Sequence, residues 1–503
     1  MVDEMVWQLC ALLIVLGLTI YYYVSKKYEY FVSKSIPFLK PTFLLGSTGP
    51  VILRKRGILE HIQLMYNSFP DARIMGAFSL MTPLYILRDP EMIKRVTTKD
   101  FNHFVDRMPL VPCEENDLVA RESLFLGSLF NLLGQRWRDM RATLSPMFTG
   151  SKIRNMFELV VECGQTMVEF LQSNTSGDLE MKDTFLRLCN DVIASVAFGV
   201  QINSFQDRDN QFLATGKKIF SLDAKKDFAR FMLIRLMPNL MHKLGVTIEN
   251  SDRAEYFRKI IIDNIRQRKE QGIVRNDMID TLLAISKQDE KWSENELIAQ
   301  CFLFFLAGLD TVATAMTFMA YELCLNPDVQ HKLYQEVFKI EESLTYEKLQ
   351  QMTYMDQVVS ETLRKWPPGN VPDRLCTQNY LYDDGTGTNF TIESGQIVMI
   401  PVSAIHHDPK YYPDPEKFLP ERFNAENVGS IPTGAYLPFG IGPRNCIASR
   451  FALMEIKTIF YWLLKSFSLE QSNKTEIPLM LSKTSYSLLA ENGVWMKLER
   501  RKT

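Results

Sequence analysis

The hydrophobic pattern of this chain begins with an almost unbroken apolar run. Residues 6–24 read VWQLCALLIVLGLTIYYYV, and apart from the tyrosine hydroxyls only Gln8 and Thr19 are polar. A helix of this length spans about 28 Å, close to the hydrocarbon core of a bilayer. Acidic residues precede the run and lysines follow it, the reverse of a secretory signal peptide, and no A-x-A cleavage pattern follows. We therefore expect residues 1–25 to form a retained N-terminal transmembrane anchor, with a buried helix as the alternative; the positive-inside rule places the rest of the chain in the cytosol.

The segment after the anchor, residues 26–49, is basic and contains Pro37, Pro41 and Gly46. These residues interrupt a helix, so we expect a stiff linker there. In residues 50–503, a short strand-like region near residues 72–89 precedes long amphipathic segments from about 130 to 375 and a loop-rich, strand-bearing C-terminal quarter. This order predicts a mainly α fold with a smaller β region, forming a single large domain behind the anchor.

A second long apolar run begins at a capping-box pattern, with Ser293 as N-cap and Glu296 three residues later, and ends before Pro327. Such a helix would be about 50 Å long, enough to cross a whole domain. A second membrane span is the rival interpretation, but polar residues interrupt the run: Gln300, Asp310 and Glu322. We predict a buried central helix. A further apolar segment, residues 227–244, is predicted to pack on the core, to cap a cavity or to lie at a membrane surface.

Charge and composition narrow the classes of function. The 57 basic and 59 acidic residues give a net charge of −2, so no global basic field favours binding to nucleic acid. Hydrophobic residues at 46% and charged residues at 23% are values of folded globular proteins. The 8 cysteines form no CxxC pair and the 6 histidines no HExxH pattern, which disfavours a zinc site. The 32 phenylalanines and 24 methionines suit an apolar cavity or ordinary core packing equally.

The predicted central helix carries an unusual group of residues at its middle. Gly308 costs about 1 kcal/mol relative to alanine in a helix interior, so its presence indicates a close approach by a ligand or a backbone. Asp310 and Thr311 follow it and place a carboxylate and a hydroxyl in an otherwise apolar wall. Because unpaired polar groups are costly in such a wall, they form either a functional pair or an ion pair and a helix-bending hydroxyl.

Two further patterns lie in the C-terminal part of the chain. Glu361 and Arg364, in ETLRKWPP, are three residues apart on a helical stretch, and Arg422 lies in FLPERF. A buried arginine needs a carboxylate partner, for which Glu361 is a candidate.

The segment 438–457, PFGIGPRNCIASRFALMEIK, concentrates the chemistry. Phe439, Gly440 and Gly442 form a glycine-rich loop that lets the backbone approach a planar ligand, and Arg444 can reach an anionic group on it. Cys446 lies just before a helical pattern, where the helix dipole and backbone N–H groups favour a thiolate. A single thiolate without a histidine base or a second cysteine suits an axial iron ligand better than a zinc site or a cysteine protease.

Taken together, these motifs identify the chain as resembling the cytochrome P-450 superfamily. The family's elements appear in order over nearly the whole length: WxxxR at Trp137 and Arg141, the A-G-x-D-T group of the central helix, ExxR, the PERF segment and FxxGxRxC. The anchor and the proline-containing linker resemble the microsomal class. The segments QRWRDMRATLSPMFTGSKIR and DVIASVAFG are most similar to insect family 9, related to vertebrate family 3.

The resemblance implies the cytochrome P-450 fold, a haem b cofactor and a role for each matching residue. Cys446 would be the axial ligand of the haem iron. The other cofactor-binding residues would be Trp137, Arg141, Arg374, Arg444, Arg107 and Phe439. Thr311 and Asp310 would be catalytic, delivering protons through ordered water. Glu361, Arg364 and Arg422 would form a buried structural network.

Two positions depart from the family pattern. Val312 stands where a second hydroxyl residue usually follows the threonine of the central helix, which puts auxiliary hydrogen bonding in doubt. Ala448 stands where glycine usually lies two residues after the cysteine. A methyl group is small, so we expect haem binding to survive.

The implied reaction is monooxygenation of hydrophobic small molecules, chiefly in xenobiotic detoxification. Electrons would come from NADPH through a separate NADPH-cytochrome P-450 reductase, with cytochrome b5 as an optional further partner, at the endoplasmic reticulum membrane. Basic residues offered to an acidic redox partner would be Arg136, Arg138 and Arg450. Substrate would contact Leu303, Leu306, Ala307, Gly369 and Val371. The alternatives are a hormone or lipid hydroxylase, a peroxide-driven isomerase or dehydratase, and a non-catalytic haem-binding protein.

Overall fold

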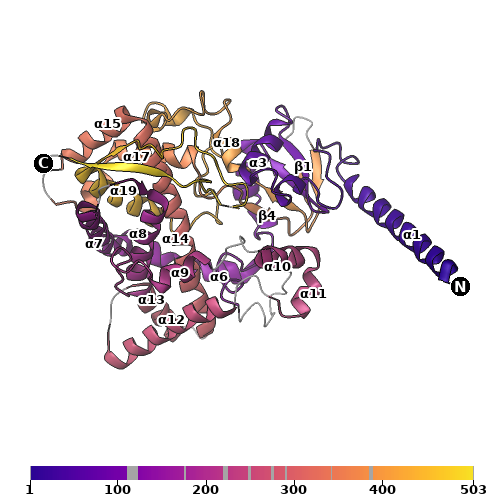
Figure 1. The fold of residues 1–503 in the computed structure, drawn as a ribbon, viewed down its shortest axis with the longest axis horizontal. Helices are drawn as coiled ribbons and strands as arrows, with labels where there is room; N and C mark the ends of the chain where they lie inside the picture. Colours follow the sequence, from indigo (N-terminus) through magenta and orange to yellow (C-terminus); the bar gives the residue numbers. More distant parts are fainter. Residues whose placement is uncertain are drawn as a thin grey trace.

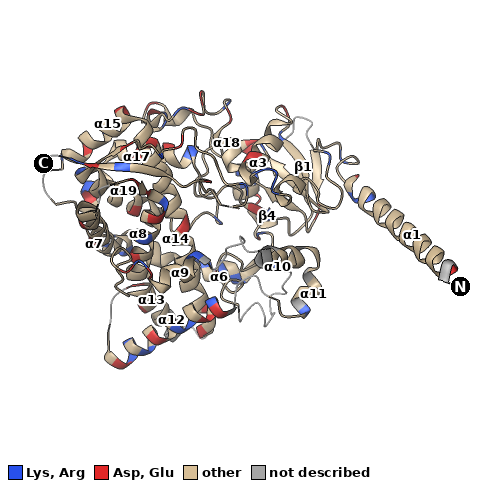
Figure 2. Cartoon of the chain, in the orientation of Figure 1, with Lys and Arg blue, Asp and Glu red and all other residues tan. Residues whose placement is uncertain are grey.

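The N-terminal helix α1 (Val2–Tyr28) projects away from the body of the protein (Figure 1). The computed structural model describes residues 2–109, 123–174, 177–218, 225–246, 251–273, 277–288, 292–340, 343–383, 389–485 and 487–501. Most side chains of α1 are apolar and exposed, and Glu4–Tyr28 is long and apolar enough to cross a membrane. Figure 2 shows this helix almost uncharged along its length, with basic residues, Lys26 and Lys27, where it approaches the body.

A four-stranded sheet forms the centre of the β region next to α1. Its order is β1 (Ile74–Ser79), β2 (Thr82–Leu87), β7 (Ile397–Met399) and β4 (Asp373–Leu375). β1 and β2 form an antiparallel hairpin, β2 and β7 are parallel, and β4 returns antiparallel to β7. The sheet therefore joins a hairpin near the N-terminus to strands some three hundred residues later.

The segment that we predicted as a linker, residues 26–49, is instead largely packed on this sheet. Phe31 is fully buried, and its ring packs directly against Gly76. A side chain at Gly76 would not fit, because its Cβ would lie 2.5 Å from the Phe31 ring. Phe38 forms a parallel bridge with Gly76, and Gly46 an antiparallel bridge with Ser79. Proline and glycine indicate only that a helix is interrupted, not whether the extended chain contacts a distant sheet.

The central helix of the body is α14 (Glu294–Leu325), as predicted. Ser293 caps it: its hydroxyl accepts from the Glu296 amide while the Glu296 side chain accepts from the Ser293 amide. Pro327 begins the next helix, α15 (Pro327–Phe338). Two thirds of the most apolar window of α14 is buried inside the protein, which identifies it as a core helix. It packs along α8 (Met181–Phe198), while α19 (Ser449–Ser466) packs on α7 (Gly150–Asn174).

The remaining elements surround these helices and the sheet. The helices are α2 (Gly49–Ile52), α3 (Ile58–Asn67), α4 (Pro90–Lys94), α6 (Gly134–Leu144), α9 (Gln211–Lys218), α10 (Lys225–Leu236), α11 (Pro238–Lys243), α12 (Ser251–Gln271), α13 (Met278–Gln288), α16 (Tyr346–Gln350), α17 (Thr353–Lys365) and α18 (Val402–His406). Strands β3 (Leu179–Glu180), β9 (Trp495–Arg500) and β8 (Phe467–Glu470) form one small sheet, and β5 (Tyr380–Asp383) and β6 (Asn389–Ile392) a hairpin.

Two apolar cores correspond to these two regions. The larger core joins the helical body, and the smaller one lies under the four-stranded sheet and takes in Phe31. The protein is thus mainly α with a smaller β region, as the hydrophobic pattern predicts. Residues from both cores meet around one cavity, which places the candidate site between them.

Candidate active site

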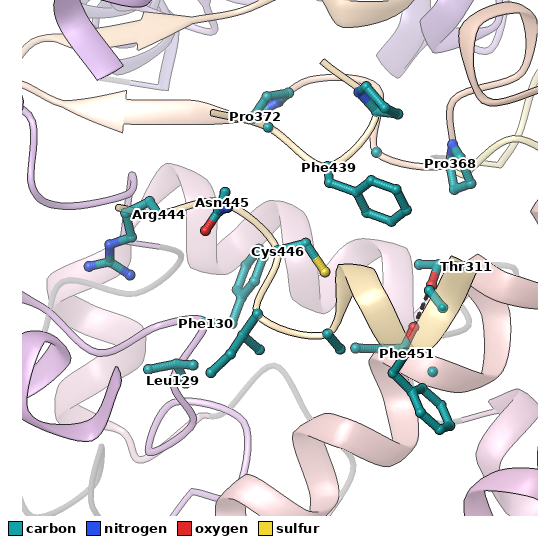
Figure 3. A pocket seen from close by; sticks show the side chains of 18 of the residues that line it. Leu129, Phe130, Thr311, Pro368, Pro372, Phe439, Arg444, Asn445, Cys446 and Phe451 are labelled. Carbon is teal, nitrogen blue, oxygen red and sulfur yellow. Dashed lines mark hydrogen bonds between the residues drawn. The ribbon is translucent and has the colours of Figure 1, made fainter. Parts of the chain in front are cut away.

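A cavity of about 490 Å³ lies where the helical body meets the sheet. Its wall is formed by the middle of α14, the segment 368–374, parts of α6 and α8, and the loop 437–448 before α19. Figure 3 shows the sulfur of Cys446 pointing into this space, between Arg444 and Thr311. The cavity therefore brings together residues that are separated by more than three hundred positions in the chain.

The loop that carries Cys446 depends on two glycines. Gly440 and Gly442 have φ angles of +71° and +79°, a left-handed conformation that other residues avoid. A Cβ on Gly442 would lie 1.9 Å from the Thr97 carbonyl oxygen, so a side chain is excluded there. The Cys446 amide donates to the Phe439 carbonyl at 2.8 Å, closing the loop. The loop geometry thus directs the thiol toward the cavity.

Helix α19 begins at Ser449, with Ala448 as its N-cap at φ −98°. This φ suits any residue, so the alanine at a position where the family usually has glycine imposes no backbone strain.

The Cys446 thiol is open to the cavity but is otherwise surrounded by protein. Burial raises its pKa, while a backbone hydrogen bond from Ala448 and the charges of Arg141 and Arg107 lower it. Burial is the largest of these effects, so the pKa of Cys446 in this structure lies above the usual value of a thiol. Binding of an electrophilic metal would draw the thiol to the thiolate form.

Four arginines from separate parts of the chain line the same cavity: Arg107, Arg141, Arg374 and Arg444. Arg444 is anchored by its Nε and Nη2, which donate to the carbonyls of Val105 and Leu132, each at 2.8 Å. Its guanidinium carbon lies 4.0 Å from the centroid of the Trp137 ring. Trp137 thus supports Arg444, and within the described part of the chain Nη1 has no hydrogen-bond partner.

The positive charge at this side of the cavity is only partly compensated, by Asp106, whose carboxylate lies 3.4 Å from Nη2 of Arg444. The Nε of Arg374 is buried without a hydrogen-bond partner among the described residues. Burial and repulsion from Arg107 lower the pKa of Arg374 to about 10 and that of Arg444 to about 8. Burial also lowers the pKa of Arg107, although Asp373 partly offsets this. Buried cations with depressed pKa values and spare donors fit a ligand that carries carboxylates.

Arg141 connects α6 to the cysteine loop. Its two terminal nitrogens donate to Asn445, at 2.9 Å to the carbonyl and 2.8 Å to the side-chain oxygen. We predicted that this arginine binds the cofactor; its partner Asn445 is 304 residues away and could not be predicted from the local sequence.

The opposite wall of the cavity is the middle of α14. Thr311 lines it, and its hydroxyl donates to the Ala307 carbonyl at 2.6 Å. Asp310 does not line the cavity: its carboxylate is 2.8 Å from Nζ of Lys182, which also donates to the Thr314 hydroxyl at 2.6 Å. The ion-pair alternative for Asp310 is therefore realised in this structure. Lys182 is the second residue of α8, and its local sequence gives no sign that it would pair with Asp310.

Gly308 makes room for a neighbouring helix. A Cβ at this position would lie 2.5 Å from the Ile193 side chain of α8. The close approach that its presence indicated is therefore a packing contact between α8 and α14, although Gly308 also lines the cavity together with Val312.

Most of the predicted substrate contacts are on the cavity wall: Leu303, Ala307, Gly369 and Val371. Leu306 is not. Successive residues on a helix are about 100° apart, which turns Leu306 away from the arc that faces the cavity. Phe304, Leu363 and Ile400 also line the cavity and were not predicted. The sequence pattern of an apolar side chain that faces a cavity is the same as that of one that faces the core.

Glu361, Arg364 and Arg422 lie together below the cysteine loop. The Glu361 carboxylate accepts from Arg364 at 2.7 and 2.9 Å and from Arg422 at 3.3 Å, and both Glu361 and Arg364 are fully buried. Arg364 also donates to the carbonyls of His406 and Pro415. These bonds join α17 to the long irregular segment that leads to the loop.

The three arginines predicted to face an acidic redox partner differ in their surroundings. Arg136 forms an ion pair with Glu296 at the start of α14. Its charge is therefore less available to a redox partner than an unpaired charge would be. Arg138 donates to the Asn102 side chain at 3.0 Å, and Arg450 is exposed. The pairing of Arg136 was hidden in the sequence because Glu296 already has a local role as a capping residue.

Comparison with known proteins gives one consistent result. The cytochrome P450 family profile matches residues 40–496 of the chain. Cytochrome P450 9e2 of Blattella germanica is 42% identical, with 94% of each chain covered. Probable cytochrome P450 9f2 of Drosophila melanogaster is 39% identical over 99% of this chain and 100% of the relative. Probable cytochrome P450 6a13 of the same organism is 34% identical over 98% of each chain.

Proposed function

This chain belongs to the cytochrome P450 family of monooxygenases, and from that premise we propose that it oxidises hydrophobic small molecules, chiefly foreign compounds, with electrons from NADPH supplied by a separate reductase. The observation that carries this proposal is the Cys446 thiol on the wall of a largely apolar cavity that four arginines also line. Haem b is an apolar planar ring with two carboxylates, and these residues fit it.

When bound, haem supplies the iron at which dioxygen is activated, so that one oxygen atom enters the substrate and the other leaves as water. Cys446 would supply the thiolate ligand of the iron. Arg107, Arg374 and Arg444 would bind the two propionates, because they line one side of the cavity and Nε of Arg374 has no partner among the described residues. Trp137 supports Arg444, Arg141 holds the loop through Asn445, and Phe439 would contact the haem from the cysteine loop.

Thr311 holds and passes protons on the other side of the cavity. Its hydroxyl hydrogen is directed to the Ala307 carbonyl, so the Thr311 oxygen is free to accept a hydrogen bond from a water molecule in the cavity. Asp310 contributes when Lys182 releases it, because its carboxylate is engaged outside the cavity.

The walls favour an apolar substrate. Leu303, Ala307, Gly369 and Val371 offer no charged group, so recognition comes from burial of apolar surface. This supports a detoxifying oxidase, and a hormone or lipid hydroxylase is the narrower alternative. A panel of structurally unrelated apolar substrates separates the two: oxidation of many favours detoxification, whereas strong preference for one favours biosynthesis.

We propose that the protein is anchored in the endoplasmic reticulum membrane by α1, with its catalytic domain on the cytosolic face. The exposed leucines of α10 and α11 support a second contact with the bilayer: Leu233, Leu236 and Leu240 are 42 to 51% exposed. NADPH-cytochrome P450 reductase, and optionally cytochrome b5, dock on the cysteine side, where Arg138 and Arg450 offer positive charge.

The test is the difference spectrum of the reduced, carbon-monoxide-bound protein, measured for the wild type and Cys446→Ser. A strongly red-shifted Soret band that disappears in the variant supports a thiolate-bound haem. Product formation that requires both NADPH and added reductase supports the electron route. An unshifted band in the wild type contradicts the assignment of Cys446, and product formed equally with peroxide alone favours the isomerase or dehydratase alternative.

A further inference from the structure

His406 ends helix α18 and is fully buried between α17 and the segment before the cysteine loop. Its imidazole bridges two backbone groups that are far apart in sequence. Nδ1 lies 3.0 Å from the carbonyl oxygen of Arg364, and the Leu437 amide donates to Nε2 at 2.9 Å. Both ring nitrogens are therefore engaged by the main chain, and neither the active-site chemistry nor the arginine cluster uses them.

The partners of this ring determine its tautomer. A backbone amide only donates, so Nε2 must present its lone pair to Leu437. A carbonyl only accepts, so Nδ1 must carry the hydrogen and donate it to Arg364. The imidazole is consequently neutral, in agreement with the lowering of the pKa of His406 to about 3 by burial and by the charge of Arg364. Protonation would leave the Leu437 amide facing a second donor.

Other contacts hold the bridge in place. The Arg364 side chain donates to the His406 carbonyl at 2.9 Å, so the two residues are linked in both directions. The Tyr436 ring stacks on the imidazole at 5.6 Å between centroids, with 24° between the planes. The Tyr436 hydroxyl donates to the Ser360 carbonyl of α17 at 3.0 Å. Residues 436 and 437 are thus tied to α17 at two points.

Leu437 is the last of these bonded residues before the cysteine loop begins. It lines the cavity together with Pro438 and Phe439, and the Phe439 carbonyl accepts the hydrogen bond from the Cys446 amide. A continuous path of backbone contacts therefore runs from the Glu361–Arg364 pair through His406 to the cysteine. A shift of Leu437 would displace Phe439 and, with it, the carbonyl that accepts the Cys446 amide hydrogen bond.

We propose that His406 is a positioning residue, which transmits the fixed geometry of the buried Glu361–Arg364 pair to the start of the Cys446 loop by accepting the Leu437 amide hydrogen bond. This inference rests on the proposed function only in that Cys446 holds the haem iron. It assigns a specific atom, Nε2, to the role. Loss of that acceptor leaves one buried donor unsatisfied and lets the loop move away from its ligating position.

Two substitutions in the full-length protein test separately the two hydrogen bonds that the His406 imidazole makes. His406→Gln places an amide oxygen near the position of Nε2 and retains an acceptor for Leu437. His406→Asn is shorter: its amide reaches the Arg364 carbonyl but not Leu437. His407→Gln is the matched control, because among the described residues the imidazole of this adjacent histidine is hydrogen-bonded to the Ser403 carbonyl of its own turn, at 2.8 Å, and not to Leu437.

Hydrogen exchange at the Leu437 amide gives the first readout and is independent of haem. We expect slow exchange in the wild type, in His406→Gln and in His407→Gln, and exchange that is roughly tenfold to a hundredfold faster in His406→Asn, the range for one lost buried hydrogen bond. Equal exchange in His406→Asn and the wild type overturns the proposal. If His406→Asn does not fold, exchange is measured in the wild type alone. Fast exchange of the Leu437 amide in the folded wild type would then overturn the proposal.

The second readout is the carbon monoxide spectrum of the reduced, haem-loaded protein. We expect the ratio of the thiolate-type band to the unshifted band to fall severalfold in His406→Asn and to stay near the wild-type ratio in His406→Gln and His407→Gln. Equal losses in the Gln and Asn variants at position 406 overturn the proposal. Failure of the proposed function is distinguishable, since the wild type itself would then lack the thiolate band while the exchange at Leu437 would still test His406.

Discussion

Replacing Glu455 by glutamine should make the protein more stable at neutral and alkaline pH. Glu455 lies on α19 and is fully buried, and neither carboxylate oxygen has a hydrogen-bond partner among the described residues. Burial raises the pKa of this carboxyl group to about 8, and the Cys189 thiol acts in the opposite direction. An uncharged amide of the same shape avoids the cost of ionising a group in that environment.

The sign and size follow from the pKa. An unfolded chain releases the proton near pH 4.5, whereas the folded protein keeps it until about pH 8. Between these values the native state binds more protons, so the stability of the wild type falls as pH rises, by about 1.4 kcal/mol per pH unit. Over the whole window the loss is of the order of 5 kcal/mol. The glutamine variant lacks this term.

The assay is chemical unfolding of the full-length wild type and Glu455→Gln in detergent at several pH values from 4 to 9. The difference in unfolding free energy, variant minus wild type, should be smallest near pH 4, increase through pH 6 and 7, and level off above about pH 8. Other titrating groups contribute equally to both proteins and cancel. Parallel stability curves would show that the carboxyl group is not held protonated and would refute the reasoning.

Two further substitutions test the cavity. Thr311→Ala should retain haem yet reduce the amount of product formed per NADPH consumed by roughly tenfold or more, the scale of a lost general acid; unchanged coupling would show that the Thr311 hydroxyl does not relay protons. Gly442→Ala forces a methyl group to within 1.9 Å of the Thr97 carbonyl at a φ of +79°. We expect a loss of several kcal/mol of stability in the loop and a corresponding loss of bound haem, measured as haem per protein; wild-type haem content would contradict the predicted clash.

The features that were predictable from sequence share one property: their cause lies within a few residues. The apolar run of α1 reflects hydropathy alone, and the start of α14 follows from the reciprocal bonds of Ser293 and Glu296. The cysteine loop was recognisable because its glycines, arginine and cysteine are neighbours in the chain. The Glu361–Arg364 contact is also local, since a helix brings residues three apart to the same side.

The features that sequence reasoning missed depend on distant segments. Residues 31–49 look like a linker until the sheet that covers Phe31 is in place. Asp310 looks like a cavity residue until α8 brings Lys182 to it. His406 is one of two adjacent histidines, and nothing in their local sequence says which one faces Leu437.

For this protein, then, the sequence by itself determined the apolar N-terminal helix, the central helix, the motif of the cysteine loop and the family, because hydropathy, capping and short motifs are properties of neighbouring residues. Only the tertiary structure decided which charges are paired, which arginines share the cavity and how the loop is held. Those outcomes depend on which distant groups meet, and electrostatic and hydrogen-bond energies change steeply with that distance and with burial.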